Sequence, residues 1–147
     1  MRPDAKPGPA ECNCHAVRAA ARHITQAYDQ FLAPSGLRTT QFSILGRLKR
    51  KGPLTINALA EEMVMDRTTL GRNLLPLERD GLIDIQPSAT DRRAKELHLT
   101  KAGEQRRQAA VKSWVAAQER FESTYGARRA AELRAMLRAV VASELTP

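Results

Sequence analysis

The chain has 147 residues, of which 42% are hydrophobic and 27% charged, so it is long enough for one globular domain and is not expected to be disordered. Two cysteines are too few for a disulfide scaffold, and no uncharged run reaches the ~18 residues of a membrane-spanning helix. Residues 1–13 lack the apolar core of a secretory signal, so we expect a cytoplasmic protein. The net charge of +8 favours a polyanionic partner, nucleic acid or an anionic membrane surface, whereas the 4% aromatic content disfavours single-strand or RNA binding by base stacking.

The chain is expected to begin with a disordered arm and two helices. Residues 1–11 combine three prolines and a glycine with few apolar side chains, which is typical of an arm without fixed structure. An apolar residue then recurs every three or four positions as far as Phe31, which predicts a helix that Asn13 caps and that ends at residues 33–36. A second helix is expected from residue 39 or 40 to residue 51, before Gly52.

Two short helices separated by a tight turn are expected next. Thr55 can cap the first, and Asp66 can cap the second, which we expect over residues 67–79. Val64 lies in the turn, and because a β-branched residue resists positive φ, we expect the turn to avoid that conformation. Gly71 leaves one position of the second helix without a side chain, at a cost of about 1 kcal/mol in helix propensity.

The apolar period then changes from helical spacing to alternation. Residues 83–86 and 96–100 alternate apolar and polar side chains, which predicts two half-buried strands. The polar link between them carries Arg92, Arg93 and Lys95, so the pair forms a hairpin with a basic tip. Two helices are expected after it, over residues 101–124 and 127–145, with a break at residues 125–126, and Thr100 can cap the first of them.

A helix pair followed by a basic hairpin predicts a winged helix-turn-helix in a mainly α (α+β) fold. The second helix of such a pair fits the major groove of duplex DNA, and Arg, Asn and Thr side chains suit the base edges there. With Leu70 facing the core, five polar side chains face outward: Arg67, Thr68, Thr69, Arg72 and Asn73. Arg92 or Arg93 would enter the minor groove. The alternative for any one such helix is an ordinary solvated face.

At this point the sequence resembles the multiple-antibiotic-resistance regulator (MarR) family of bacterial transcription factors. The resemblance covers about residues 14–145 and is carried by five segments: Leu59–Met63, Met65–Leu70, Leu77–Ile83, Asp91–Lys95 and Leu97–Gly103. It implies one domain over residues 12–147, with a winged helix-turn-helix at 37–100 and dimerisation helices at 12–36 and 101–147. It also implies a homodimeric, sequence-specific regulator, in most members a repressor, that binds a pseudo-palindromic double-stranded DNA operator and is released by a small aromatic ligand or by cysteine oxidation.

The resemblance also assigns roles within the DNA-binding region. The five outward residues listed above match the recognition helix. Asp91 and Arg93 match a wing pair in which the carboxylate orients the groove-reaching arginine. Arg92 and Lys95 are expected on phosphates, as is Thr55 at the start of the preceding helix.

Two further sets of residues are candidates for regulation. Cys12 and Cys14 lie at the start of the first helix, and three interpretations stay open: a redox switch, since a thiol at a helix N-terminus reacts readily, a metal site with His15, or packing at a dimer interface. An effector pocket is implied between the dimerisation helices and the winged region. Its candidate residues offer a charge, a hydroxyl or an aromatic wall, although such residues more often belong to core or surface: His23, Tyr28, Arg38 and Trp114.

Two other classes of function are alternatives to DNA binding. A protein–protein interaction adaptor on the same fold, without specific DNA binding, is the alternative, although the basic wing and polar recognition face argue against it. An enzyme is not expected, because the sequence shows no phosphate loop, nucleophile–base pair or paired carboxylates. We expect no cofactor and no bound metal.

Overall fold

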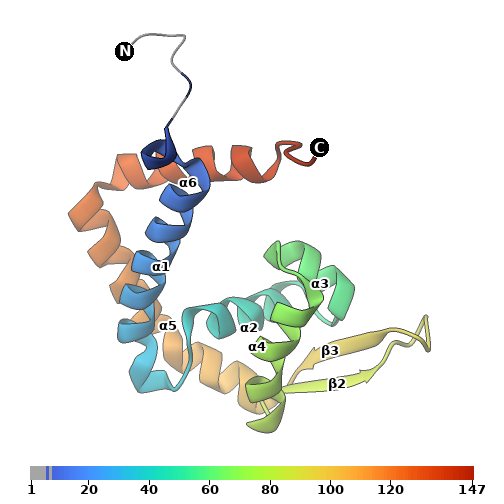
Figure 1. Ribbon diagram of the computed structural model, residues 1–147. Helices are drawn as coiled ribbons and strands as arrows, with labels where there is room; N and C mark the ends of the chain where they lie inside the picture. Colours follow the sequence, from blue (N-terminus) through green and yellow to red (C-terminus); the bar gives the residue numbers. More distant parts are fainter. Residues whose placement is uncertain (1–5, 7) are drawn as a thin grey trace.

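The computed structural model describes residue 6 and residues 8–147, and its elements fall into two parts (Figure 1). The first part, here called the helical frame, comprises α1 (Asn13–Leu32), α5 (Lys101–Tyr125) and α6 (Ala127–Val141). The second, the winged part, comprises residues 37–100. Among the described residues, no helix combines the length and apolar character needed to cross a membrane.

The N-terminal expectations are corrected in two places. Most of the expected arm, residues 1–5 and 7, lies outside the described residues, whereas Pro9–Glu11 form a short 3-10 helix instead of an arm without structure. Asn13 is the first residue of α1 and not its cap. Cys12 takes that place because its backbone is extended and its Sγ accepts a hydrogen bond from the backbone N–H of His15 at 3.4 Å. The helix ends where predicted, and a 3-10 turn follows at Ala33–Ser35.

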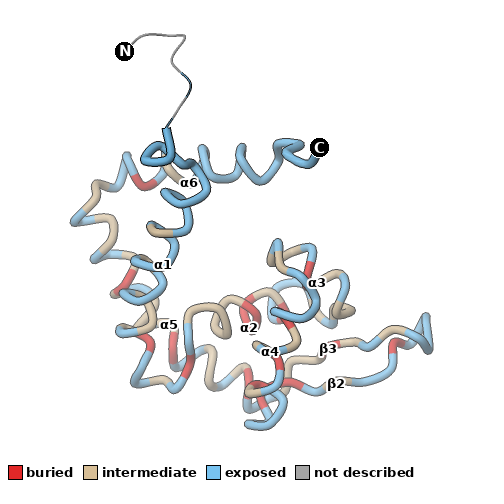
Figure 2. Tube along the Cα trace, in the orientation of Figure 1, coloured by how far each residue is buried: buried red, intermediate tan, exposed pale blue. Residues whose placement is uncertain are grey.

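The other end of the helical frame is shorter than predicted. Helix α6 ends at Val141 and not at residue 145. The hydroxyl of Ser143 donates to the carbonyl of Ala139 at 2.7 Å, a side-chain bond that competes with further helix hydrogen bonds. Figure 2 shows that α6 is exposed along most of its length, so packing against the rest of the described chain gives its last turn little support.

The winged part has the predicted order of elements with one short strand added. Its helices are α2 (Thr39–Lys51), α3 (Ile56–Met63) and α4 (Arg67–Arg79), and its hairpin is β2 (Ile83–Pro87) with β3 (Lys95–Leu99). The added strand β1 (Leu54–Thr55) pairs with β3 on the side opposite β2, which gives an antiparallel sheet of order β1-β3-β2. Leu97 of β3 therefore lies between Leu54 and Ile85 in the register.

Three side-chain caps form as the sequence predicts, and one turn does not. Thr55, Asp66 and Thr100 each accept a hydrogen bond from a backbone N–H three residues on, at 3.1, 2.8 and 3.0 Å, and so begin α3, α4 and α5. Val64 adopts the left-handed conformation that we expected the turn to avoid, with φ 51° and ψ 50°. This backbone lets the N–H groups of Val64 and Met65 bond to the carbonyls of Glu61 and Ala60, which closes the end of α3.

The hydrophobic core belongs mainly to the winged part. The largest fully buried side chains come from α1, α2, α3, α4 and the hairpin: Leu32, Ile44, Leu45, Leu59, Leu70, Leu77, Ile83 and Leu97. The first turn of α5 completes this core. A Cβ at Gly103 would lie 2.0 Å from the carbonyl oxygen of Leu82, so only glycine permits this approach.

Candidate nucleic-acid interface

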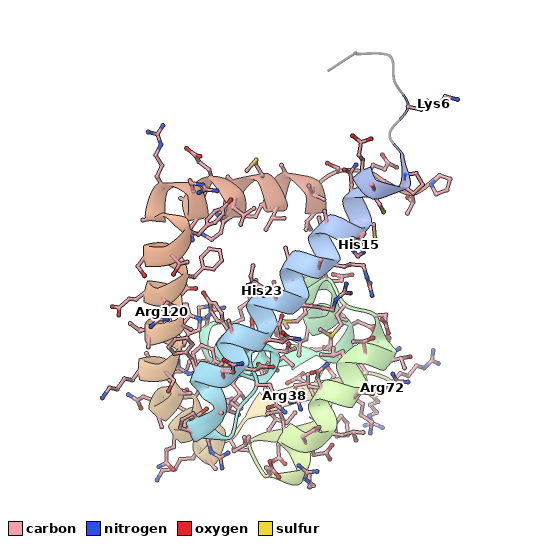
Figure 3. The ribbon with its side chains drawn as sticks, turned by 60° about the vertical axis from the view of Figure 1, so that its left-hand side comes forward. Lys6, His15, His23, Arg38, Arg72 and Arg120 are labelled. Carbon is pink, nitrogen blue, oxygen red and sulfur yellow. The ribbon has the colours of Figure 1, made fainter. Side chains whose placement is uncertain are left out.

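Helix α4 divides cleanly into a core face and an outward face. Leu70, Leu74 and Leu77 are buried, whereas four of the five predicted reading residues, Arg67, Thr68, Thr69 and Arg72, are exposed and Asn73 is half-buried. Arg72 lies on the side of α4 that faces away from α1 (Figure 3).

Hydrogen bonds along α4 separate the predicted reading residues into two groups. The carboxylate of Asp66 accepts from both the backbone N–H and the hydroxyl of Thr69, at 2.8 and 2.7 Å, and these bonds lower the pKa of the Asp66 carboxyl. The Asn73 amide donates to the carbonyl of Thr69 at 2.9 Å. Thr69 and Asn73 thus use polar groups to hold their own helix. In the described part of the chain, no such bond engages the side chains of Arg67, Thr68 or Arg72.

The tip of the wing is held by its backbone. One carboxylate oxygen of Asp91 accepts from the backbone N–H of Arg93 at 3.0 Å, and the carbonyl of Asp91 accepts from Ala94 N–H at 3.0 Å. Ser88 N–H then bonds to the carbonyl of Ala94, which closes the loop. Asp91 therefore fixes the course of the chain at Arg93, and it does so through the main chain of the arginine.

Three elements converge on one open, polar concavity of about 210 Å³. Its lining includes half of the ten predicted DNA-contacting residues, drawn from the start of α3, the start of α4 and the wing: Thr55, Arg67, Asp91, Arg93 and Lys95. Three cations and one carboxylate leave this concavity with a positive formal charge. Its size and charge suit a phosphate group. Thr68 and Arg72 lie beyond it on α4, and Arg92 is exposed at the wing tip.

The sequence reasoning missed two residues of this surface. Asn57, in the first turn of α3, lines the same concavity. Leu75 is 65% exposed on the outward face of α4, three residues after Arg72. Helical spacing places Leu75 on that face, but a search for hydrogen-bonding side chains alone passes over a leucine.

The predicted effector residues do not share one cavity. His23 and Tyr28 line a largely apolar cavity of about 330 Å³ between α1, α5 and α6, where the Tyr28 hydroxyl bonds to Gln118 and burial, with Glu122 nearby, raises the pKa of Tyr28. Trp114 lines a second cavity of about 370 Å³ between α2 and α5. Arg38 borders a shallow depression near the end of α1.

Both cysteines are exposed free thiols. Within the described residues, no three His, Cys, Asp or Glu side chains gather closely enough to hold a metal ion. The geometry around Cys12 is that of a helix cap, with the His15 backbone as its partner.

A recognition helix beside a basic wing defines the class of winged-helix DNA-binding proteins. The sequence model of the MarR family matches residues 35–94. The transcriptional regulator MosR of M. tuberculosis, whose structure was solved with DNA, is 38% identical with a TM-score of 0.78, over 92% of this chain and 100% of that one. The repressor CouR, bound to a 23-mer DNA duplex, is 25% identical with a TM-score of 0.79, over 94% and 99% of the two chains.

A curated relative adds a further sequence match. The organic hydroperoxide resistance transcriptional regulator of Bacillus subtilis is 29% identical over 90 residues, 61% of each chain. This chain spans from about two fifths to two thirds of the length of the curated relatives it matches. The chain belongs to the MarR family of DNA-binding transcriptional regulators.

Proposed function

We propose that the chain is a homodimeric transcriptional repressor that binds a pseudo-palindromic DNA operator. The observation that carries this proposal is the concavity in which Arg67, Arg93 and Lys95 converge from α4 and the wing. Three cations from separate elements around one concave surface suit a DNA backbone that crosses between helix and wing.

Each element then has its own task on the duplex. Helix α4 enters the major groove, where Arg72 and Thr68 meet base edges and Arg67 faces the backbone. Arg93 reaches the minor groove, guided by the bond from its backbone to Asp91. Arg92, Lys95 and Thr55 bind phosphates.

Exposed apolar side chains in the helical frame support the homodimer. Met136, Leu137, Val140 and Val141 form a stripe along α6, and Val17 is exposed on α1. Stripes of this kind mark contact with another chain, and a second copy would bring two winged parts to two half-sites.

Release from DNA is proposed through one of two routes. An aromatic carboxylate would suit the cavity between α2 and α5, where the rings of Phe42 and Trp114 stack with centroids 6.0 Å apart and Arg50 and Arg107 lie at the rim. The second route is oxidation of Cys12 or Cys14, whose thiols are exposed. DNA binding measured with peroxide and with benzoate separates the two routes. The double variant Cys12→Ser with Cys14→Ser would remove only the response to peroxide, and Trp114→Ala would remove only the response to benzoate.

The test of the proposal is DNA binding as a function of salt. The full chain is mixed with duplexes from a random-sequence pool, and the tightest binders are titrated at several salt concentrations. Arg93→Ala should weaken binding and lower the salt slope by about 1. Arg128→Ala, which removes the same charge from the start of α6, is the matched control and should leave the slope unchanged. Equal slopes for Arg93→Ala and wild type would contradict the wing assignment, and no binding at low salt would favour the adaptor.

A further inference from the structure

One large apolar side chain stands among the polar residues of the outward face of α4. Leu75 is 65% exposed, whereas the other three leucines in the same stretch of helix, Leu70, Leu74 and Leu77, are buried. An exposed leucine leaves apolar surface in contact with water, which is unfavourable in free energy, whereas a polar side chain at the same position would be well hydrated.

The neighbours of Leu75 follow from helix geometry. Residues three and four apart share a face, so Leu75 lies beside Gly71 and Arg72 on one side and Arg79 on the other. A helical side chain leans toward the N-terminus and covers the preceding turn. Leu75 therefore leans toward Gly71, where an added Cβ would meet no protein atom within 4 Å. The result is an open notch at Gly71, bordered by one apolar side chain and flanked by arginines.

This arrangement has a direct counterpart in the major groove. The C5-methyl group of thymine is the apolar feature that distinguishes its base pair there, beside the acceptors that arginine and threonine contact. We propose that Leu75 is a specificity-determining residue that contacts the methyl group of a thymine, with the notch at Gly71 giving that methyl group room. This inference rests on the proposed entry of α4 into the major groove.

Two features favour DNA over another protein as the partner of this leucine. Leu75 continues the surface of Thr68 and Arg72, and the flanking Arg72 and Arg79 suit a polyanion. The apolar side chains exposed on α6, by contrast, form a stripe of several residues, as a protein contact requires. A single leucine beside open space at Gly71 instead suits a single methyl group.

The test removes the methyl group from the DNA and the side chain from the protein in turn. The probes are the tightest duplexes that the full wild-type chain selects from a random pool, with each thymine replaced singly by uracil. At one thymine in each half-site, loss of the methyl group should weaken wild-type binding about fourfold, the size expected for one buried methyl group. Leu75→Ala should bind the unmodified duplex about as weakly as wild type binds a duplex with uracil at this thymine in both half-sites, because the variant lacks the contact in both subunits. It should also no longer respond to that uracil, because the two changes remove the same contact.

Two variants keep this test clear of folding effects. Leu75 is 65% exposed, so Leu75→Ala should retain the wild-type unfolding midpoint. Leu145→Ala removes another exposed leucine, near the C-terminus, and should bind both duplexes as wild type does. Gly71→Ala should raise the unfolding midpoint, since alanine favours the helix, and yet weaken DNA binding by filling the notch.

Three results would overturn the proposal. The first is a Leu75→Ala chain that responds to uracil as strongly as wild type does. The second is a set of selected duplexes in which no thymine methyl group affects binding. The third is a Gly71→Ala chain that binds as tightly as wild type. Failure of wild type to bind any duplex would instead remove the proposed function on which this inference depends.

Discussion

The winged part and the helical frame bury their apolar residues to different degrees. In the winged part, leucines from three helices and a hairpin meet in one core, and side-chain caps at Thr55 and Asp66 fix where α3 and α4 begin. In the helical frame, α6 buries only Ala130 and exposes a stripe of larger residues, among them Val140 at 47%. The same chain thus contains one part whose core is closed and one part that leaves an apolar stripe exposed.

The difference separates two requirements of a DNA-reading protein. The reading surface must be rigid, and it is rigid because a closed core and capped helices hold it. In the proposed homodimer, the frame sets the distance between two reading surfaces by packing against a second copy. Changes in the winged part should therefore act on stability, whereas changes on α6 should act on association.

The largest effect is expected where the two parts meet, at Gly103. Gly103→Ala would press a Cβ to within 2.0 Å of the Leu82 carbonyl and close to Leu99. We expect the free energy of unfolding to fall by about 3 kcal/mol or more, since backbone cannot yield as a flexible side chain does. Urea unfolding measures this, and Gly71→Ala, which meets open space, is the matched control with the opposite sign. A Gly103→Ala chain as stable as wild type would refute the close approach of α5 to the Leu82 backbone.

The next effect concerns association through α6. Val140→Glu places a charge in the exposed apolar stripe and should shift the protein from dimer to monomer in sedimentation. Its affinity for a duplex with two half-sites should then fall about 10²-fold or more, because the second half-site no longer adds to the first. Ala131→Glu, an exposed position on the other side of α6, should do neither. A Val140→Glu chain that remains dimeric would show that the stripe lies outside the interface.

A smaller effect is expected at the turn between α3 and α4. Val64 is 69% exposed and holds a left-handed backbone that costs a β-branched residue about 1–2 kcal/mol. Val64→Gly should relieve this strain and raise the free energy of unfolding by about 0.5–1 kcal/mol, after the greater freedom of glycine in the unfolded chain is subtracted. Chemical unfolding reports the sign. A loss of stability would indicate that the valine side chain makes a contact that outweighs the strain.

The smallest effect is a dependence on pH at the contact between the two parts. The Glu104 carboxylate accepts two hydrogen bonds from Arg107, at 2.7 and 2.8 Å, and lies 3.5 Å from Lys49 of α2. These cations, Arg107 first, lower the pKa of Glu104 from its ordinary value of 4.5. The ion pair therefore stabilises the fold above pH 4.5, and this stability is lost as pH falls through the lowered pKa.

Glu104→Gln tests this sign. The variant should be less stable than wild type near neutral pH, and the two unfolding midpoints should converge as the pH is lowered below about 4.5. Glu119→Gln, on the same helix and exposed, should follow wild type at every pH. Parallel curves for Glu104→Gln and wild type would show that the carboxylate contributes equally in both protonation states.

The elements of the winged part could be predicted because their signals are local. Asp66 and Thr100 are capping residues directly before apolar repeats, and the alternation at residues 83–86 belongs to a strand with one buried face. The strand β1 could not be found, since Leu54 and Thr55 are too few to show a period and pair only because β3 lies beside them. The backbone of Val64 was predicted wrongly, because the hydrogen bonds that close the end of α3 outweigh the preference of a β-branched residue for negative φ.

The candidate site could be predicted only in part, for a similar reason. Spacing along α4 identifies the residues that face outward, but it does not show that Thr69 and Asn73 bond to their own helix. The effector candidates were chosen by side-chain chemistry, and tertiary packing then distributes His23, Arg38 and Trp114 among three separate concave surfaces. Contacts between distant segments decide these placements, and a single sequence does not reveal them.

In the proposed complex with DNA, the winged part reads the duplex at a spacing set by the helical frame. This arrangement is tested most directly by titrating the full chain against duplexes that carry two inverted copies of a selected half-site at stepwise increasing separations. The account predicts tightest binding when the half-site centres lie about 10 base pairs, one helical turn, apart on the same face of the duplex, with a steep loss at half-turn offsets. Affinity that is indifferent to the separation would contradict it.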